Sequence, residues 1–165
     1  MAIDAPLLAL AEGHGRLLRH CESLTRLHAM VAGGGVDHLA RAMAAELRRE
    51  LDRATARLHQ DEELALFPAL LESMAGSDAV CIRQMVDARA EEHREIESRW
   101  LGLDQWLQAV EAGEPALPPP GTVEAFVALC QAHLEQEDGE LLPMAERLLS
   151  DDALEGIAES MQRRR

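Results

Sequence analysis

Aromatic side chains are scarce in this sequence. They make up 2% of the 165 residues, and tyrosine is missing altogether. Hydrophobic residues nevertheless account for 47% of the chain, with leucine and alanine dominant. Strands favour aromatic and β-branched residues, whereas leucine and alanine are strong helix formers. The composition therefore predicts helices, and a chain of this length can bury a substantial core.

Cysteine, positive charge and long apolar runs are also scarce. Three cysteines without regular spacing form no disulfide framework and indicate reduced thiols. The net charge of −14 argues against nucleic acid, and we interpret Arg163-Arg164-Arg165 as a local feature. No stretch reaches the length of a membrane span, and the first residues lack the basic region of a signal peptide. We expect a soluble, cytoplasmic protein.

Apolar residues recur at helical spacing over four long stretches. Asp4 is the predicted cap of the first stretch, Gly33-Gly34-Gly35 stops it, and Asp37 caps the second. The turn Gly76-Ser77-Asp78 precedes the third, and Thr122 caps the fourth after a proline-rich loop. Short turns predict an all-α, up-down-up-down four-helix bundle over about residues 5–149. Residues 150–165 add a short tail helix, within a single domain spanning 1–165.

Histidines and carboxylates lie on the inward stripes of these stretches. His59 and Glu63 are four residues apart, as are His133 and Glu137, so each pair shares one helix face. Counted from the turns at ~1.5 Å per residue, four histidines reach a similar depth: His14, His59, His93 and His133. Burying such groups is costly unless something neutralises and coordinates them. The pattern predicts a metal centre, and its ligand types suit iron or manganese, with zinc or copper as alternatives.

The inward carboxylate of the second stretch has two candidates. The two halves of the chain repeat, and aligning Pro68 with Pro143 pairs Glu62 with Glu137. The four-residue spacing from His59 instead favours Glu63, because it lies closer in angle. Glu62 remains an alternative or additional ligand.

The ordered elements resemble a known family. The first predicted helix contributes a histidine, and the second contributes His-x-x-x-Glu before Leu-Phe-Pro. The third contributes Glu-His, and the fourth contributes His-x-x-x-Glu before Leu-Leu-Pro. From about Leu7 to Leu149, this resembles the hemerythrin-like, His-His-Glu cation-binding family. The resemblance implies a four-helix bundle holding two non-haem iron ions, bridged by two carboxylates and an oxo or hydroxo oxygen. The implied ligands are His14, His59, Glu63 or Glu62, His93, His133 and Glu137.

Two positions depart from the family pattern. Arg89 stands where oxygen-carrying hemerythrins have a further histidine, and Leu58 where the family often has one. A cation on an inward stripe needs a partner. We expect Arg89 to pair with a carboxylate beside the metals, Glu62 or Glu12, and to leave one iron open. Asp138 is either a surface residue or a substitute carboxylate.

The departures bear on function. The loss of a histidine makes the site resemble members that sense or handle oxygen, nitric oxide, peroxide or iron, rather than stable oxygen carriers. Our leading hypothesis is a di-iron protein that binds such a small ligand as sensor, scavenger or transient carrier. The alternatives are an iron-handling or iron–sulfur repair enzyme and a metal-dependent binding module. The sequence leaves open whether the protein is an enzyme.

Overall fold

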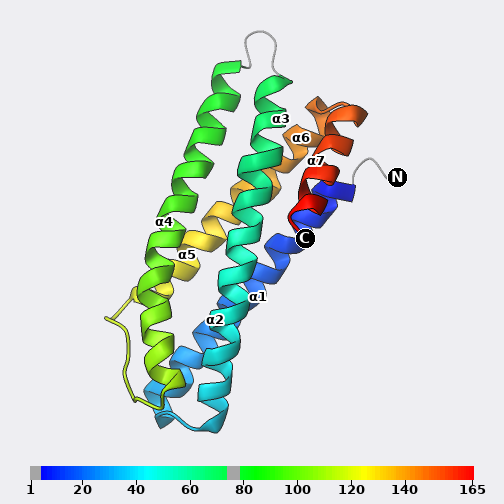
Figure 1. Ribbon diagram of the computed structural model, residues 1–165. Helices are drawn as coiled ribbons and strands as arrows, with labels where there is room; N and C mark the ends of the chain where they lie inside the picture. Colours follow the sequence, from blue (N-terminus) through cyan, green and yellow to red (C-terminus); the bar gives the residue numbers. More distant parts are fainter. Residues whose placement is uncertain (1–4, 74–78) are drawn as a thin grey trace. The chain divides into compact units, whose positions relative to one another are not determined.

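A computed structural model describes residues 5–73 and 79–165 (Figure 1). Within these ranges the regular structure is entirely helical, which confirms the predicted all-α class. The elements are α1 (Ala5–Gly34), α2 (His38–Asp61), η1 (Glu62–Leu66), α3 (Phe67–Glu72), α4 (Ala79–Glu111), α5 (Thr122–Gln136), η2 (Glu137–Leu141), α6 (Leu142–Leu148) and α7 (Asp151–Arg163). The cap predicted at Asp4 and the turn predicted at 76–78 lie outside the described residues. None of the helices described combines the length and apolar character that a membrane crossing requires.

Among the helix-end signals that fall on described residues, the predicted stop after α1 and the predicted cap of α2 are confirmed, and the predicted cap of α5 is wrong. Gly35 adopts a φ of 76° directly after α1, a conformation that suits glycine and ends the helix there. Asp37 caps α2 as predicted, because its Oδ1 accepts the amide of Ala40 at 2.8 Å. The predicted cap at Thr122 is wrong: this residue begins α5, and its hydroxyl donates to the carbonyl of Pro119 at 2.7 Å.

Two five-residue π-helical segments interrupt the helices ahead of prolines. Pro68 follows η1, and Pro143 occupies the equivalent place after η2. The amide of Phe67 bonds the carbonyl of Glu62, five residues back. A proline ring clashes with the carbonyl four residues earlier and offers no N–H, so a wider turn relieves the conflict. The sequence predicted a kink or an end at Pro68, whereas the helical path continues into α3.

The chain forms two compact units. The first comprises Met1–His14, Ala56–His93 and His133–Arg165, and the second comprises Gly15–Thr55 and Arg94–Ala132. Every site residue predicted from the sequence belongs to the first unit. The interior of that unit includes the fully buried side chains of Leu10, Leu66, Leu70, Ile82 and Leu141.

The second unit buries both cysteines that the sequence placed on core stripes. Cys21 and Cys130 are almost inaccessible, and the neighbouring Cys21 together with burial raises the pKa of the Cys130 thiol. The indole of Trp100 donates to Asp52 at 3.1 Å. This unit therefore buries both thiols and gives the Trp100 indole a hydrogen-bond partner.

Candidate metal centre

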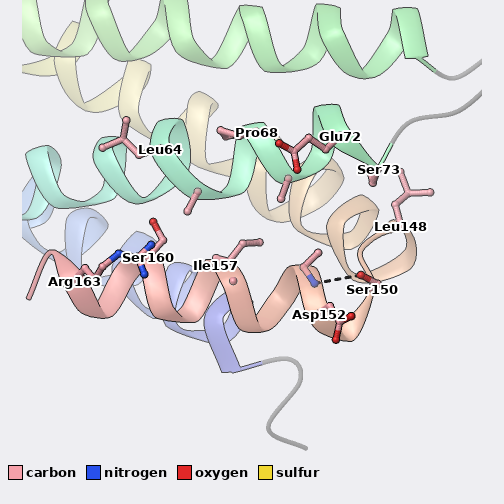
Figure 2. Close-up of a pocket in the computed structure, with 14 residues that line it drawn as sticks. Leu64, Pro68, Glu72, Ser73, Leu148, Ser150, Asp152, Ile157, Ser160 and Arg163 are labelled. Atoms are coloured by element: carbon pink, nitrogen blue, oxygen red, sulfur yellow. Dashed lines mark hydrogen bonds between the residues drawn. The ribbon is translucent and has the colours of Figure 1, made fainter.

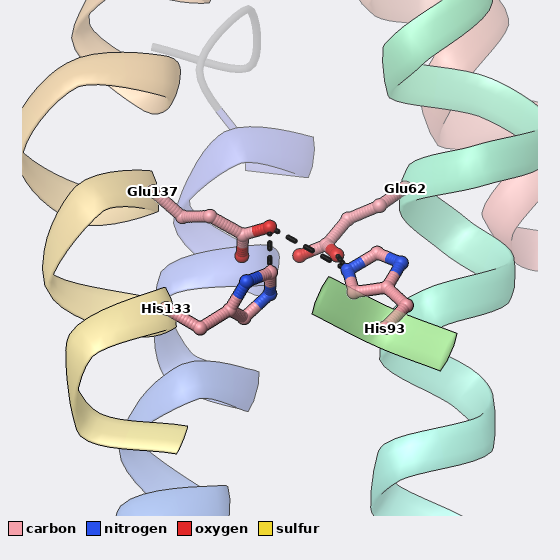
Figure 3. Close-up of side chains that lie close together, drawn as sticks. All are labelled: Glu62, His93, His133 and Glu137. Atoms are coloured by element: carbon pink, nitrogen blue, oxygen red, sulfur yellow. Dashed lines mark ion pairs between the residues drawn. The ribbon is translucent and has the colours of Figure 1, made fainter. Parts of the chain in front are cut away.

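Four buried side chains of the first unit converge on one point (Figure 3). Each offers a ligand atom, and these atoms lie within 4.8 Å of one another. The four residues are Glu62 at the start of η1, His93 on α4, His133 on α5 and Glu137 at the start of η2. All four are at most 2% exposed. Two carboxylates and two imidazoles so placed are expensive to keep buried without a compensating charge.

His14 on α1 completes the cluster, and the carboxylate oxygens divide between the imidazoles. Glu62 Oε1 and Glu137 Oε2 lie 2.9 and 3.1 Å from Nε2 of His14. The other Glu62 oxygen lies 2.9 Å from Nε2 of His93. The other Glu137 oxygen lies 3.0 Å from Nε2 of His133 and 3.6 Å from that of His93. Each carboxylate therefore presents one oxygen to His14 and the other to His93, and Glu137 also reaches His133.

Several of these atoms are close together without forming hydrogen bonds. Glu62 Oε2, His93 Nε2 and both oxygens of Glu137 are buried and have no hydrogen-bond partner among the residues described. An unsatisfied buried polar atom costs about 1–3 kcal/mol, so a cluster of them calls for an explanation. Converging imidazole nitrogens and carboxylate oxygens are a donor set that suits iron. The residues present thus fit a bound metal.

Partly exposed carboxylates contact the outer ring nitrogen of three of these histidines. Nδ1 of His14 lies 2.6 Å from Asp138 Oδ1, and Nδ1 of His93 lies 2.7 Å from Glu63 Oε1. For His133 the distance from Nδ1 to Glu92 Oε2 is 2.5 Å. A carboxylate that accepts the Nδ1 proton fixes the tautomer, orients the ring and leaves Nε2 free to bind a metal. A carboxylate that contacts Nδ1 therefore orients each of these three inward imidazoles.

In the metal-free protein the same contacts keep protons on the imidazoles. Burial lowers the pKa of His14, but its contacts with the carboxylates of Asp138, Glu137 and Glu62 outweigh this and raise the pKa to about 11. In the same way, burial is outweighed by Glu137, Glu62 and Glu63, which raise the pKa of His93 to about 10. Metal binding must therefore release protons.

The pKa values of the two central carboxylates, Glu62 and Glu137, are shifted in opposite directions. Burial and then the charge of Glu137 raise the pKa of Glu62. Burial also acts to raise the pKa of Glu137, but the close ion-pair contacts with His133, His14 and His93 outweigh it and lower this pKa well below its usual range. The lowered pKa keeps Glu137 ionised in the metal-free protein.

The structure divides the residues predicted from the sequence into inner and outer positions. Of the two glutamates that the sequence left open, Glu62 faces the centre, and Glu63 contacts the outer nitrogen of His93. His59 is buried and lies face to face with the ring of His93, with ring centroids 3.8 Å apart and planes at 12°. Its place among the metal ligands stays a prediction.

Arg89 is inward, but its expected partner was wrong. The side chain is 7% exposed, and Nη2 donates to Glu92 Oε1 at 2.7 Å rather than to Glu62 or Glu12. Glu92 thereby links Arg89 to His133. Glu92 was not predicted as a site residue, although its position beside His93 was the available signal.

Asp61, at the end of α2, was missed as well, and it is 2% exposed. Only its place beside Glu62 could have pointed to it.

The sequence matches a model of a known protein family. The model of the hemerythrin HHE cation-binding domain matches residues 6–145. The chain belongs to this family. The matched range contains all the residues that converge at the centre, and hemerythrin domains typically bind iron. A search of curated proteins returned no significant match. The hemerythrin-like domain and its His/Glu cluster together describe a metal-binding helical protein.

Proposed function

We propose that this hemerythrin-like protein holds two non-haem iron ions and binds a small ligand, namely oxygen, nitric oxide or peroxide. The observation that carries the proposal is the division of the carboxylate oxygens. Each of Glu62 and Glu137 turns one oxygen to His14 and the other to His93, and that second oxygen of Glu137 also contacts His133. Two bridging carboxylates between two ions require such an arrangement.

The proposed ligands form two unequal sets. The first position would use His14 Nε2, Glu62 Oε1 and Glu137 Oε2, and the second would use the other oxygens with His93 and His133. In this proposal His59 packs against His93, and Glu63 accepts the Nδ1–H of His93. The first position has fewer protein ligands, which leaves room for a small molecule.

The surrounding residues support ligand binding in a dry site. Bound iron supplies redox chemistry and an open coordination position for a small molecule. The chain itself holds the imidazoles in one tautomer through Asp138, Glu63 and Glu92 and keeps the inward side chains at most 2% exposed. We propose a role as sensor, scavenger or transient carrier on this basis.

Elemental analysis combined with absorption spectra tests the proposal. Protein from iron-replete cells should contain about two iron ions per chain, and its spectrum should change between air, anaerobic buffer and added nitric oxide. Only trace metal would contradict the metal centre itself. Two ions with a spectrum indifferent to oxygen, nitric oxide and peroxide would instead favour a metal-dependent binding module.

A further inference from the structure

The tail helix α7 lies beyond the part of the chain that the family model matches. The match ends at residue 145, and α7 spans Asp151–Arg163. Ser150 caps it by accepting the amide of Ala153 at 3.2 Å. Leu154, Ile157 and Met161 are its buried residues. This chain therefore carries an element that the family pattern does not explain, within the same unit as the metal centre.

α7 lies alongside α3 and contacts the π-helical segment η1 (Figure 2). Between α7 and the η1–α3 segment lies a groove of about 710 Å³, lined partly by Pro68, Ile157 and Ser160. The contact places the tail against the segment that begins with Glu62. Movement of α7 would thus act on the backbone that carries a central carboxylate.

The residues after this helix engage a buried carboxylate. Asp61 is 2% exposed, and its Oδ1 accepts from Nε of Arg164 at 2.9 Å. Its Oδ2 accepts from Nη1 and Nη2 of Arg165 at 3.2 and 3.3 Å. Arg164 is itself fixed by a 2.8 Å bond from Nη1 to Ser160 Oγ. Removing the cationic partners of a buried carboxylate is strongly destabilising, so these contacts hold Asp61 firmly.

Asp61 and Glu62 are consecutive, so the two carboxylates are anchored through one stretch of backbone. Asp61 ends α2 and bonds the tail, while Glu62 begins η1 and reaches His14 and His93. Shifting Asp61 toward solvent would move the backbone of Glu62 with it. π-Bulges are rare but are frequent at functional sites, and here the tail anchors the residue immediately before one.

We propose that α7 is a positioning clamp for the metal centre, in which Arg164 and Arg165 hold Asp61 so that Glu62 stays directed at the metals. This inference rests on the proposed metal centre. Because coupling between two binding events is reciprocal, docking of the tail strengthens metal retention, and metal loading strengthens docking of the tail.

The test compares iron loss from variants of the full chain loaded anaerobically with iron(II). The clamp variant is Arg164→Gln with Arg165→Gln. The matched control is Arg83→Gln with Arg147→Gln, which makes the same charge change at two exposed positions that do not line the groove. A third variant, Arg164→Lys with Arg165→Lys, keeps the charge. Iron loss to a chromogenic iron(II) chelator is followed by absorbance, and amide hydrogen exchange over 151–163 reports docking of α7.

The clamp variant should lose iron about tenfold faster than the control, in the range typical of residues that orient metal ligands. The lysine variant should recover most of the difference. Amides of α7 should exchange faster in the clamp variant, and faster in iron-free than in iron-loaded wild type. Equal iron-loss rates in clamp and control variants would overturn the inference, even if α7 exchanged faster. Wild type that retains no iron would instead count against the proposed function.

Discussion

At the scale of single residues, two consecutive glutamates occupy different places. Glu62 is 1% exposed and contacts two imidazole nitrogens from inside the centre. Glu63 is partly exposed and contacts His93 from the outer side. We therefore predict that replacing Glu62 and replacing Glu63 have different effects on metal binding.

Replacing each glutamate by alanine should separate the two roles. Glu62→Ala removes an oxygen from both proposed metal positions, so we expect it to lose at least one iron ion per chain. Glu63→Ala removes only the acceptor behind His93, so it should keep both ions at saturating iron with an affinity about 10–100-fold lower. Elemental analysis and chelator competition measure the two effects. Loss of iron in Glu63→Ala with full retention in Glu62→Ala would reverse the assignment.

Glu92 offers a second test at this scale. It accepts from both Arg89 and His133, so Glu92→Gln leaves a buried guanidinium with a neutral partner and weakens the hold on the imidazole. We expect an iron affinity about tenfold lower. Glu91→Gln, at the exposed position next to it, serves as the control and should match wild type in chelator competition. Identical affinities for the two variants would leave Glu92 without a role at the centre.

The positions of the central histidines could be predicted from the sequence more accurately than the residues that contact them. Helical stripes and depth counting brought His14, His93 and His133 to one level, and these three do lie together. The choice between Glu62 and Glu63 could not be made from four-residue spacing, because a π turn begins at Glu62. Contacts within a helix turn, such as that of Arg89 with Glu92, were overlooked in favour of partners on other helices.

At the scale of elements, the two π turns occupy equivalent places in the two halves. Each begins at a central glutamate and ends two residues before a proline. The alignment of Pro68 with Pro143 paired Glu62 with Glu137, and the structure places these residues at the starts of η1 and η2. The proline repeat was therefore the more informative signal. The clamp by the tail could not be predicted, because the arginine run alone does not name Asp61 as its partner.

Pro68→Ala tests whether the proline maintains the π turn. Alanine removes the clash with the carbonyl of Leu64 and supplies an N–H, so a regular helix becomes accessible in the metal-free protein. We expect the metal-free form to melt at a higher temperature while iron affinity falls by roughly tenfold or less, a trade between stability and function. Pro115→Ala, in the exposed loop before α5, is the control. Unchanged iron affinity in Pro68→Ala would show that the turn does not need its proline.

At the scale of the whole molecule, metal and fold should be linked. A ligand present at 1,000 times its Kd stabilises the folded state by about 4 kcal/mol. For a chain of this size that corresponds to a melting temperature roughly 8–16 °C higher. We therefore expect chelation to lower the melting temperature by about this amount, measured by calorimetry at fixed pH. Equal melting curves with and without metal would mark the cluster as incidental to stability.

The stability of the metal-free protein should fall as the pH rises from 7 to 10. His14 and His93 have folded pKa values of about 11 and about 10, above the ordinary 6.5. The folded state therefore binds protons that the unfolded chain has released. Their stabilisation is complete below about pH 6.5 and is lost as the pH rises through the folded pKa values.

Assignment of this alkaline effect is simplified because the sequence contains neither lysine nor tyrosine, which leaves the three cysteines as the other side chains that titrate in the same range. Each proton bound only by the folded state contributes about 1.4 kcal/mol per pH unit. That corresponds to roughly 3–5 °C per pH unit in the melting temperature. Iron-loaded protein should show a much flatter profile, since metal replaces the protons. His14→Gln should reduce the slope in the metal-free form, whereas His20→Gln, at a histidine of the second unit, should not. A metal-free melting temperature that is constant from pH 7 to 10 would exclude proton-stabilised imidazoles at the centre.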